Sequence, residues 1–233
     1  MRTHVLGVPI DTFTLAEATD LVISWMGQKE KMIFTPNPEM IVRAGKDKEF
    51  MEVLCKADLI VPDGIGVVLA SKKIKERVAG FDLVVSVLKN TPKPINVYIF
   101  GAAKGVAKKA KTNIEKNYPN VKVVGTHSGF FTDDIIVIEE IQNLKPDLLL
   151  VGLGFPKQEK WIFANRDKLP VSIGVGGTID VLAGVVKRAP DIFIKLGLEW
   201  FYRLLADPKR IFRMINLPLF VIKVLLSKGG GRN

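Results

Sequence analysis

Short runs rich in β-branched residues alternate with longer stretches of helical period, and this alternation constrains the fold more than any other feature. The predicted strands cover residues 4–10, 32–36, 58–62, 96–102, 121–125, 147–154 and 171–177. The predicted helices cover residues 15–26, 38–57, 81–90, 105–117, 134–144 and 156–169. The run 147–154 is apolar on both faces, as in a central strand. We therefore predict an α/β fold, with a mostly parallel, Rossmann-like sheet and helices on both of its faces.

The strand signals stop at about Ala189, and the rest of the chain has a different character. It is predicted to form two or three helices that are interrupted just before Pro208 and Pro218. We predict an α/β domain over residues 1–189 and a basic, amphipathic, helical appendage over residues 190–233.

Charge is unevenly distributed along the chain, whose net charge is +10. Residues 187–233 hold ten Lys and Arg residues against three Asp and Glu, so the preceding part is nearly balanced. A basic tail of this kind predicts an anionic partner, either nucleic acid or phospholipid. Interleaved Leu, Ile and Phe favour lipid over nucleic acid.

The tail segment 211–226 (IFRMINLPLFVIKVLL) is strongly apolar. Pro218 and Lys223 interrupt it, and it is shorter than the roughly 20 apolar residues of a membrane-spanning helix. It is predicted either to lie in a membrane interface or to pack on the body of the protein or on another subunit. The residues alone leave these alternatives open.

Glycine, proline and short polar side chains follow several predicted strands at their carboxyl ends. These turns cover residues 34–40 (FTPNPEM), 61–66 (VPDGIG), 100–105 (FGAAKG), 152–159 (GLGFPKQE) and 174–180 (GVGGTID). In a parallel sheet, ligands bind beyond this edge, where helix N-termini point backbone N–H groups outward. Five such turns on one edge predict a site for a phosphorylated ligand.

Several common site types are absent from the sequence. No G-x-G-x-x-G with an acidic residue about 20 positions further on follows the first strand, and no G-x-x-x-x-G-K-[ST] loop occurs. His4 and His127 are too few for a zinc cluster, and residues 132–134 (TDD) are not the metal-binding D-x-D. The single cysteine, Cys55, excludes an internal disulfide and is expected at a buried helix position. We expect neither a metal nor a cofactor.

Six blocks of residues are highly specific and follow one another along nearly the whole chain. They are 35–40 (TPNPEM), 62–68 (PDGIGVV), 77–83 (RVAGFDL), 154–161 (GFPKQEKW), 174–190 (GVGGTIDVLAGVVKRAP) and 196–213 (LGLEWFYRLLADPKRIFR). The chain resembles the WecG/TagA/CpsF glycosyltransferases, glycosyltransferase family 26, and is most like the TagA N-acetylmannosaminyltransferases among them.

The resemblance implies an activity and a location. It implies transfer of N-acetylmannosamine from UDP-N-acetylmannosamine to N-acetylglucosamine linked to undecaprenyl diphosphate, in the synthesis of wall teichoic acid or a related surface polymer. It further implies a cytoplasmic protein held peripherally on the inner face of the cell membrane, with an anionic membrane surface as partner and no nucleic acid. A homo-oligomer is compatible with the sequence.

Asp63 has two interpretations. On the residues alone it caps a helix, an interaction worth roughly 1 kcal/mol. The resemblance favours Asp63 as the catalytic base of an inverting, metal-independent transfer. One carboxylate suffices there, because UDP leaves without the help of an acid.

The remaining site residues follow from the resemblance and from the turns. Arg77 is expected to stabilise the diphosphate, while Thr35, Asn37 and Gln158 bind substrate; the alternatives are an ordinary turn for the first pair and a solvated surface position for Gln158. Nucleotide contacts are expected at Gly101, Ala102, Phe155, Lys157 and Gly176. Contacts to the lipid diphosphate or the membrane are expected at Arg203, Arg210 and Arg213.

Two rival interpretations stay open. One is a nucleotide-binding enzyme of another class, such as an oxidoreductase or hydrolase. The other is a non-catalytic module that binds a membrane through its basic tail.

Overall fold

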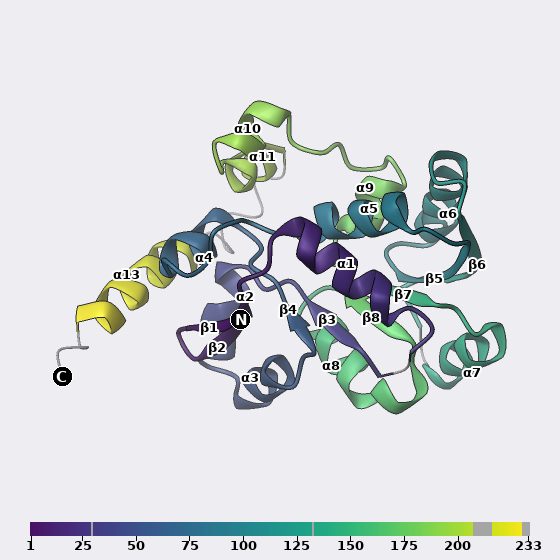
Figure 1. Ribbon diagram of the computed structural model, residues 1–233, viewed down its shortest axis with the longest axis horizontal. Coiled ribbons are helices and arrows are strands. Elements are labelled where there is room, and N and C mark those ends of the chain that lie inside the picture. The colour runs from purple at the N-terminus through teal and green to yellow at the C-terminus, as the bar shows by residue number, and fades with distance from the viewer. Residues whose placement is uncertain (29, 132, 207–215, 230–233) are drawn as a thin grey trace.

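The computed structural model describes residues 1–28, 30–131, 133–206 and 216–229, and its centre is a parallel sheet (Figure 1). The sheet has six strands in the order β4-β3-β8-β7-β5-β6, and every neighbouring pair is parallel. The strands are β3 (Met32–Phe34), β4 (Leu59–Ile60), β5 (Ile95–Gly101), β6 (Val121–His127), β7 (Leu148–Gly152) and β8 (Val171–Gly174). The predicted α/β fold is confirmed.

Helices cover both faces of the sheet, as the alternation predicts. On one face lie α1 (Leu15–Trp25), α5 (Gly80–Asn90), α6 (Val106–Asn117) and α9 (Thr178–Leu182). On the other lie α2 (Pro38–Ala44), α3 (Lys48–Cys55), α7 (Ile135–Leu144) and α8 (Lys157–Ala164). A short 3₁₀ helix, η1 (Arg166–Lys168), precedes β8.

Side chains of the central strands alternate between the two cores. Val97 and Ile99 of β5 pack with the first group of helices, whereas Tyr98 and Phe100 pack with the second. This period of two follows from the pleat of a strand, which points successive side chains to opposite faces. A strand buried on both faces therefore has to be apolar at every position.

The first predicted strand, residues 4–10, is instead a hairpin. Its strands β1 (Arg2–Val5) and β2 (Val8–Asp11) form a separate antiparallel sheet. Leu6 and Gly7 between them have φ values of 49° and 87°, and two successive positive φ values are the signature of the tightest hairpin turn. A leucine in the first of these positions hides the turn from the sequence pattern.

The predicted helix over residues 38–57 is two helices. The first, α2, ends before Gly45, and the Asp47 side chain accepts a hydrogen bond of 3.0 Å from the Phe50 amide to begin α3. Cys55 is the last residue of α3 and is exposed, so the buried position expected for it is wrong. The helix end turns this side chain away from the core.

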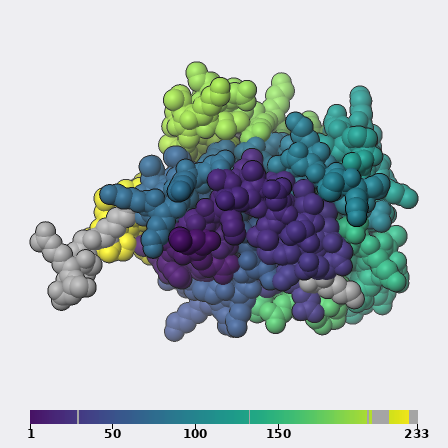
Figure 2. Space-filling view, viewed as in Figure 1, coloured from purple at the N-terminus to yellow at the C-terminus, as the bar shows by residue number. Residues whose placement is uncertain are grey.

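Within the described residues, the helices α10 (Asp191–Lys195), α11 (Glu199–Ala206) and α13 (Asn216–Gly229) follow the sheet domain. Helix α13 contacts α4 (Ile65–Ala70). Gly197, with a φ of 70°, separates α10 from α11. Pro218 does not break the tail, because it lies in the first turn of α13, where its missing N–H has no helical partner. The interruption expected before Pro208 lies outside the described residues. Figure 2 shows α10 and α11 as a raised lobe.

Helix α13 contains most of the apolar tail segment. Phe220 and Val224 are buried in the core with α2 and α4, so one side of the helix packs on the body. The other side exposes Val221, Ile222, Leu225 and Leu226, with 50–70% of each residue's surface accessible. Within the described residues, no helix has the length and apolar character needed to cross a membrane. The boundary between residues 189 and 190 stays a prediction.

Candidate active site

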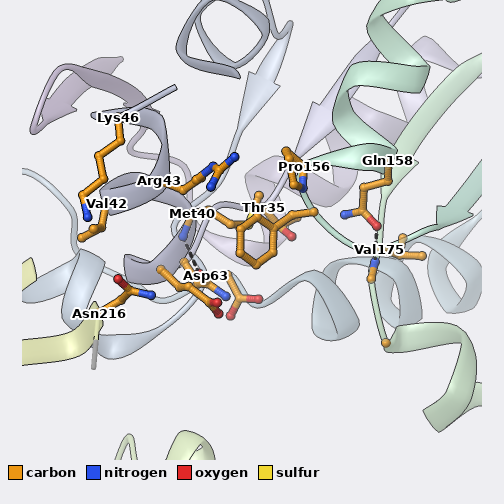
Figure 3. Close-up of a pocket in the computed structure, with 16 residues that line it drawn as sticks. Thr35, Met40, Val42, Arg43, Lys46, Asp63, Pro156, Gln158, Val175 and Asn216 are labelled. Atoms are coloured by element: carbon orange, nitrogen blue, oxygen red, sulfur yellow. Dashed lines mark hydrogen bonds between the residues drawn. The ribbon is translucent and has the colours of Figure 1, made fainter. Parts of the chain in front are cut away.

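A polar cavity of about 600 Å³ opens at the carboxyl edge of the sheet (Figure 3). It is lined by Thr35, Asn37, Glu39, Met40, Val42, Arg43, Lys46, Asp63, Gly154, Phe155, Pro156, Gln158, Val175, Gly176, Gly177 and Asn216. These residues come from the ends of four strands and from the helices that follow them, with Asn216 added by the start of α13.

The topology of the sheet explains why the cavity lies there. Strands β3 and β8 are neighbours, but α2, which follows β3, and α9, which follows β8, cover opposite faces. The two connections diverge at the carboxyl edge and leave a crevice between them, which is the usual ligand site of an open parallel sheet.

The β3 side of the cavity holds Thr35 and Asn37. Asn37 caps α2, since its side-chain oxygen accepts a hydrogen bond of 3.0 Å from the Met40 amide. Thr35 packs against the start of α5, where a Cβ at Gly80 would lie 2.9 Å from the Thr35 Oγ1 atom. The glycine of the block 77–83 therefore leaves room for Thr35. Asn37 therefore both caps a helix, as an ordinary turn residue does, and lines the cavity.

Asp63 lies where the loop after β4 meets the loop after β3. Its backbone N–H donates a hydrogen bond of 3.2 Å to the Pro36 carbonyl oxygen, which fixes the two loops to each other. The N-cap of α4 is Gly64, with a φ of 96°, so Asp63 lies one residue before the cap position. The half-buried Asp63 carboxylate lines the cavity.

The α8 side of the cavity is built around Gln158, which is only 4% exposed and so is not a solvated surface residue. The Gly176 amide donates a hydrogen bond of 3.0 Å to the Gln158 Oε1 atom, and the Gln158 Nε2 atom donates one of 2.7 Å to the Glu159 carboxyl. Glu159 is fully buried, and this burial raises its pKa to about 7. Phe155 and Gly176, both predicted nucleotide contacts, line the same cavity.

Two cations of the cavity were not predicted from the sequence. Arg43 and Lys46 belong to the last turn of α2 and the residues just after it, and Arg43 also forms an ion pair of 3.5 Å with Asp47. Figure 3 shows them across the cavity from Gln158. The available signal was their spacing, since they lie six and nine residues after the Asn37 cap at the edge of the sheet.

A second, mostly apolar groove of about 370 Å³ adjoins the polar cavity. It is lined by Asn37, Pro38, Glu39, Asp63, Gly64, Ile65, Gly66, Leu69, Arg77, Gly197, Glu199, Trp200, Leu217 and Val221. Its walls are α4, the turn before α11, α11 itself and α13. Asn37, Glu39 and Asp63 line both hollows, so Asp63 lies at their junction.

Arg77 lines this apolar groove and is not among the residues of the polar cavity. Its guanidinium donates a hydrogen bond of 3.0 Å to Glu199 of α11 and approaches Asp82 of α5 at 3.5 Å. Arg188 also pairs with Asp82. These ion pairs connect the appendage to the sheet domain beside the groove.

The other predicted contacts lie elsewhere or outside the described part of the chain. Gly101, Ala102 and Lys157 do not line either hollow. A Cβ at Gly101 would lie 2.3 Å from the Gly152 oxygen, so close strand packing explains that glycine. Arg203 lies in α11 with its side chain undescribed, and Arg210 and Arg213 fall outside the described residues. Among the described residues, no three His, Cys, Asp or Glu side chains gather as metal ligands would.

Comparisons with known proteins agree on one family. The model of the "Glycosyl transferase WecG/TagA/CpsF family" matches residues 3–233. A protein of Bacillus subtilis (strain 168) is 41% identical over 201 residues, covering 83% of this chain and 78% of the relative. A protein of Staphylococcus aureus (strain MRSA252) is 35% identical over 240 residues, covering 97% of this chain and 93% of the relative. Both relatives are named N-acetylglucosaminyldiphosphoundecaprenol N-acetyl-beta-D-mannosaminyltransferase.

Proposed function

The chain belongs to the WecG/TagA/CpsF family of glycosyl transferases, and we propose that it transfers N-acetylmannosamine to undecaprenyl-diphosphate-linked N-acetylglucosamine. The names of its relatives specify this acceptor and the β-linked sugar. We further propose UDP-N-acetylmannosamine as the donor, and wall teichoic acid or a related surface polymer as the product of the pathway.

The observation that carries the proposal is the position of Asp63 between two hollows of different chemistry. The polar cavity is within the size range of small-ligand sites and has cations at one end, which suits a sugar nucleotide. The apolar groove suits the lipid end of the acceptor, whose sugar would then extend toward Asp63. Donor and acceptor would meet at the Asp63 carboxylate, in the loop between β4 and α4.

In this reaction Asp63 acts as the base. It takes the proton of the acceptor hydroxyl as that oxygen attacks the anomeric carbon of the donor. A bond forms between the acceptor oxygen and that carbon, and the bond from the carbon to the phosphate oxygen breaks. UDP leaves with the electron pair. Attack opposite the leaving group inverts the configuration, so an α-linked donor gives a β-linked product.

Protein groups are proposed to stabilise the negative charge of the departing UDP without a metal. Arg43 and Lys46 supply positive charge in the polar cavity, and the turn at Gly176 and Gly177 supplies backbone amide groups. Arg77 lies on the groove side of Asp63, where it suits the diphosphate of the lipid acceptor. Activity that survives EDTA supports this part of the proposal, and activity that EDTA abolishes contradicts it.

The appendage is proposed to hold the enzyme on the inner face of the cell membrane. The exposed face of α13 continues into the groove through Val221, so a lipid bound in the groove would lie next to that face. Trp200 of α11 lines the same groove and is 40% exposed. Arg203, Arg210 and Arg213 are proposed contacts of the lipid diphosphate or anionic head groups.

One experiment tests the function. The protein is incubated with UDP-N-acetylmannosamine and a short-chain lipid-linked N-acetylglucosamine, and UDP release is measured with each substrate omitted in turn. We expect release that depends on both substrates and a product that contains both sugars. Release without the acceptor would indicate hydrolysis, and no release would return the chain to the rival interpretations.

A further inference from the structure

The geometry points to Glu159 as a positioning residue that holds the Gln158 side-chain amide in one orientation at the wall of the polar cavity. Glu159 is 0% exposed, so it does not touch a ligand in that cavity itself. It acts through Gln158, which lines the cavity and is its hydrogen-bond partner. The inference deepens the proposed function, and rests on it for the identity of the ligand.

The hydrogen bonds fix which end of the Gln158 amide faces which neighbour. The Gly176 backbone N–H donates to Gln158 at 3.0 Å, and only the side-chain oxygen accepts such a bond. The Nε2 atom must then lie on the other side, where it donates to the Glu159 Oε1 atom at 2.7 Å. A flipped amide would set two donors against each other at Gly176, and an oxygen against the carboxyl.

This arrangement determines what Gln158 presents to the cavity. One of its two Nε2 hydrogens is committed to Glu159, and one lone pair of its Oε1 atom is committed to Gly176. One hydrogen-bond donor and one acceptor remain. A sugar hydroxyl, an acetamido group or a phosphate oxygen of the donor substrate is a suitable partner for them.

The surroundings of Glu159 are arranged around this contact. Gly174 of β8 leaves the space for it, since a Cβ there would lie 3.1 Å from the Gln158 Nε2 atom and 3.3 Å from the Glu159 Oε1 atom. The second carboxyl oxygen, Oε2, is buried with no hydrogen-bond partner among the described residues. A buried polar atom left unpaired is costly to a fold, and a feature that costs stability without a structural return indicates a functional role.

The first test compares two substitutions of Glu159. Glu159→Met fills the space without an acceptor, whereas Glu159→Gln keeps an oxygen that accepts the Gln158 hydrogen. We expect Glu159→Met to raise the KM for the UDP-sugar and the Kd for UDP about tenfold, with kcat changed less than about threefold. Glu159→Gln should restore both constants to within about threefold of the parent protein.

A second measurement needs no turnover and no ligand. The chain has three glutamines, Gln28, Gln142 and Gln158, and Glu159→Gln adds a fourth, so ¹⁵N labelling of the glutamine side chains gives three or four amide groups to assign. We expect hydrogen exchange of the Gln158 amide to be at least about tenfold faster in Glu159→Met than in Glu159→Gln. This readout separates failure of the inference from failure of the proposed function, because it does not require sugar transfer.

The control removes a partly exposed carboxylate that also accepts a hydrogen bond, on the opposite face of the sheet. Glu115 of α6 accepts a hydrogen bond of 2.9 Å from the Val123 amide, and Glu115→Met should leave the KM and the Gln158 exchange unchanged. The inference is overturned if folded Glu159→Met keeps the Gln158 exchange rate of the parent protein. It is also overturned if Glu159→Gln loses as much donor affinity as Glu159→Met.

Discussion

The polar cavity and the apolar groove meet at Asp63, but they are walled in different ways. Hydrogen bonds between strand ends hold the polar cavity, such as those from the Asp63 amide to Pro36 at 3.2 Å and from the Val175 amide to Val151 at 2.8 Å. The groove is held by side-chain contacts between segments far apart in the chain, such as the ion pair of 3.0 Å between Arg77, in the loop before α5, and Glu199 of α11. The donor half of the site is thus built into the sheet, whereas the acceptor half depends on how the tail docks.

The sharpest test of this comparison is at the junction itself. Asp63→Asn keeps the shape of both hollows but removes the base, so kcat should fall about 10³-fold, the typical contribution of a general base. UDP affinity, which depends on the polar cavity, should stay within about threefold. UDP release and calorimetric titration with UDP measure the two quantities.

Asp20→Asn is the matched control, because Asp20 is an exposed residue of α1, and no residue of α1 lines either hollow. It should leave kcat unchanged. If Asp63→Asn retains more than about a tenth of the parent kcat, Asp63 is not the base and the junction has no catalytic meaning.

The second prediction separates the two halves by loosening the tail. Phe220 is the buried anchor of α13, with 2% of its surface exposed, and it packs beside Gly66 of α4. Phe220→Ala should cost about 3–5 kcal/mol of packing energy, which is enough to release the helix. The KM for the acceptor should rise severalfold, whereas the Kd for UDP should change less, because α13 adds only Asn216 to the wall of the polar cavity.

Leu225→Ala, on the exposed side of the same helix, controls for the loss of apolar surface without loss of the anchor. Hydrogen exchange of α13 reports whether the helix has been released. An equal loss of donor and acceptor affinity in Phe220→Ala would show that the two halves are not separable.

The two halves also differ in how far the sequence predicts them. The polar cavity can be predicted from local patterns. Glycine, proline and a short polar side chain mark each turn after a strand, as at Asn37, Asp63 and Gly176. Parallel strands then bring those turns to one edge. Arg43 and Lys46 were not predicted as cavity residues, because their position there depends on the direction in which α2 leaves the sheet.

The groove could not be predicted in the same way, since it is formed by contacts between residues far apart in the chain. Arg77 was expected beside the nucleotide, and no local pattern announces its partner Glu199. In α13 the residues from Leu217 to Leu226 are apolar on nearly all sides, so the sequence does not state which side meets the body. The docking of α13 depends on surfaces such as that at Gly66, where a Cβ would lie 3.7 Å from the Phe220 ring.

The pH dependence of stability tests the wall of the polar cavity that holds Glu159. Burial raises the pKa of Glu159 to about 7, so the folded protein keeps this proton at pH values where the unfolded chain has lost it. Stability should therefore fall as pH rises from about 5 to 8, by about 2–3 kcal/mol from this group. Glu159→Gln has no such proton to lose.

Urea unfolding at pH 5 and pH 8 measures this contribution as the difference between the parent protein and Glu159→Gln. Glu115→Gln, which changes a partly exposed carboxylate, is the control and should follow the parent protein. Identical pH slopes for the parent and Glu159→Gln would mean that water reaches Glu159 and that this wall of the cavity is not rigid.

The smallest expected effect concerns the outer face of the tail. Leu225 and Leu226 of α13 are 64% and 70% exposed, and burying them in a membrane interface would contribute about 1 kcal/mol or more together. Leu225→Ser with Leu226→Ser should weaken binding to phosphatidylglycerol vesicles about tenfold and leave the Kd for UDP unchanged. The matched control is Ile135→Ser with Ile136→Ser, since these residues of α7 are 57% and 58% exposed at the other end of the sheet. Vesicle sedimentation measures both pairs. An equal loss in the two would mean that general hydrophobicity, and not the tail, brings the enzyme to its lipid acceptor.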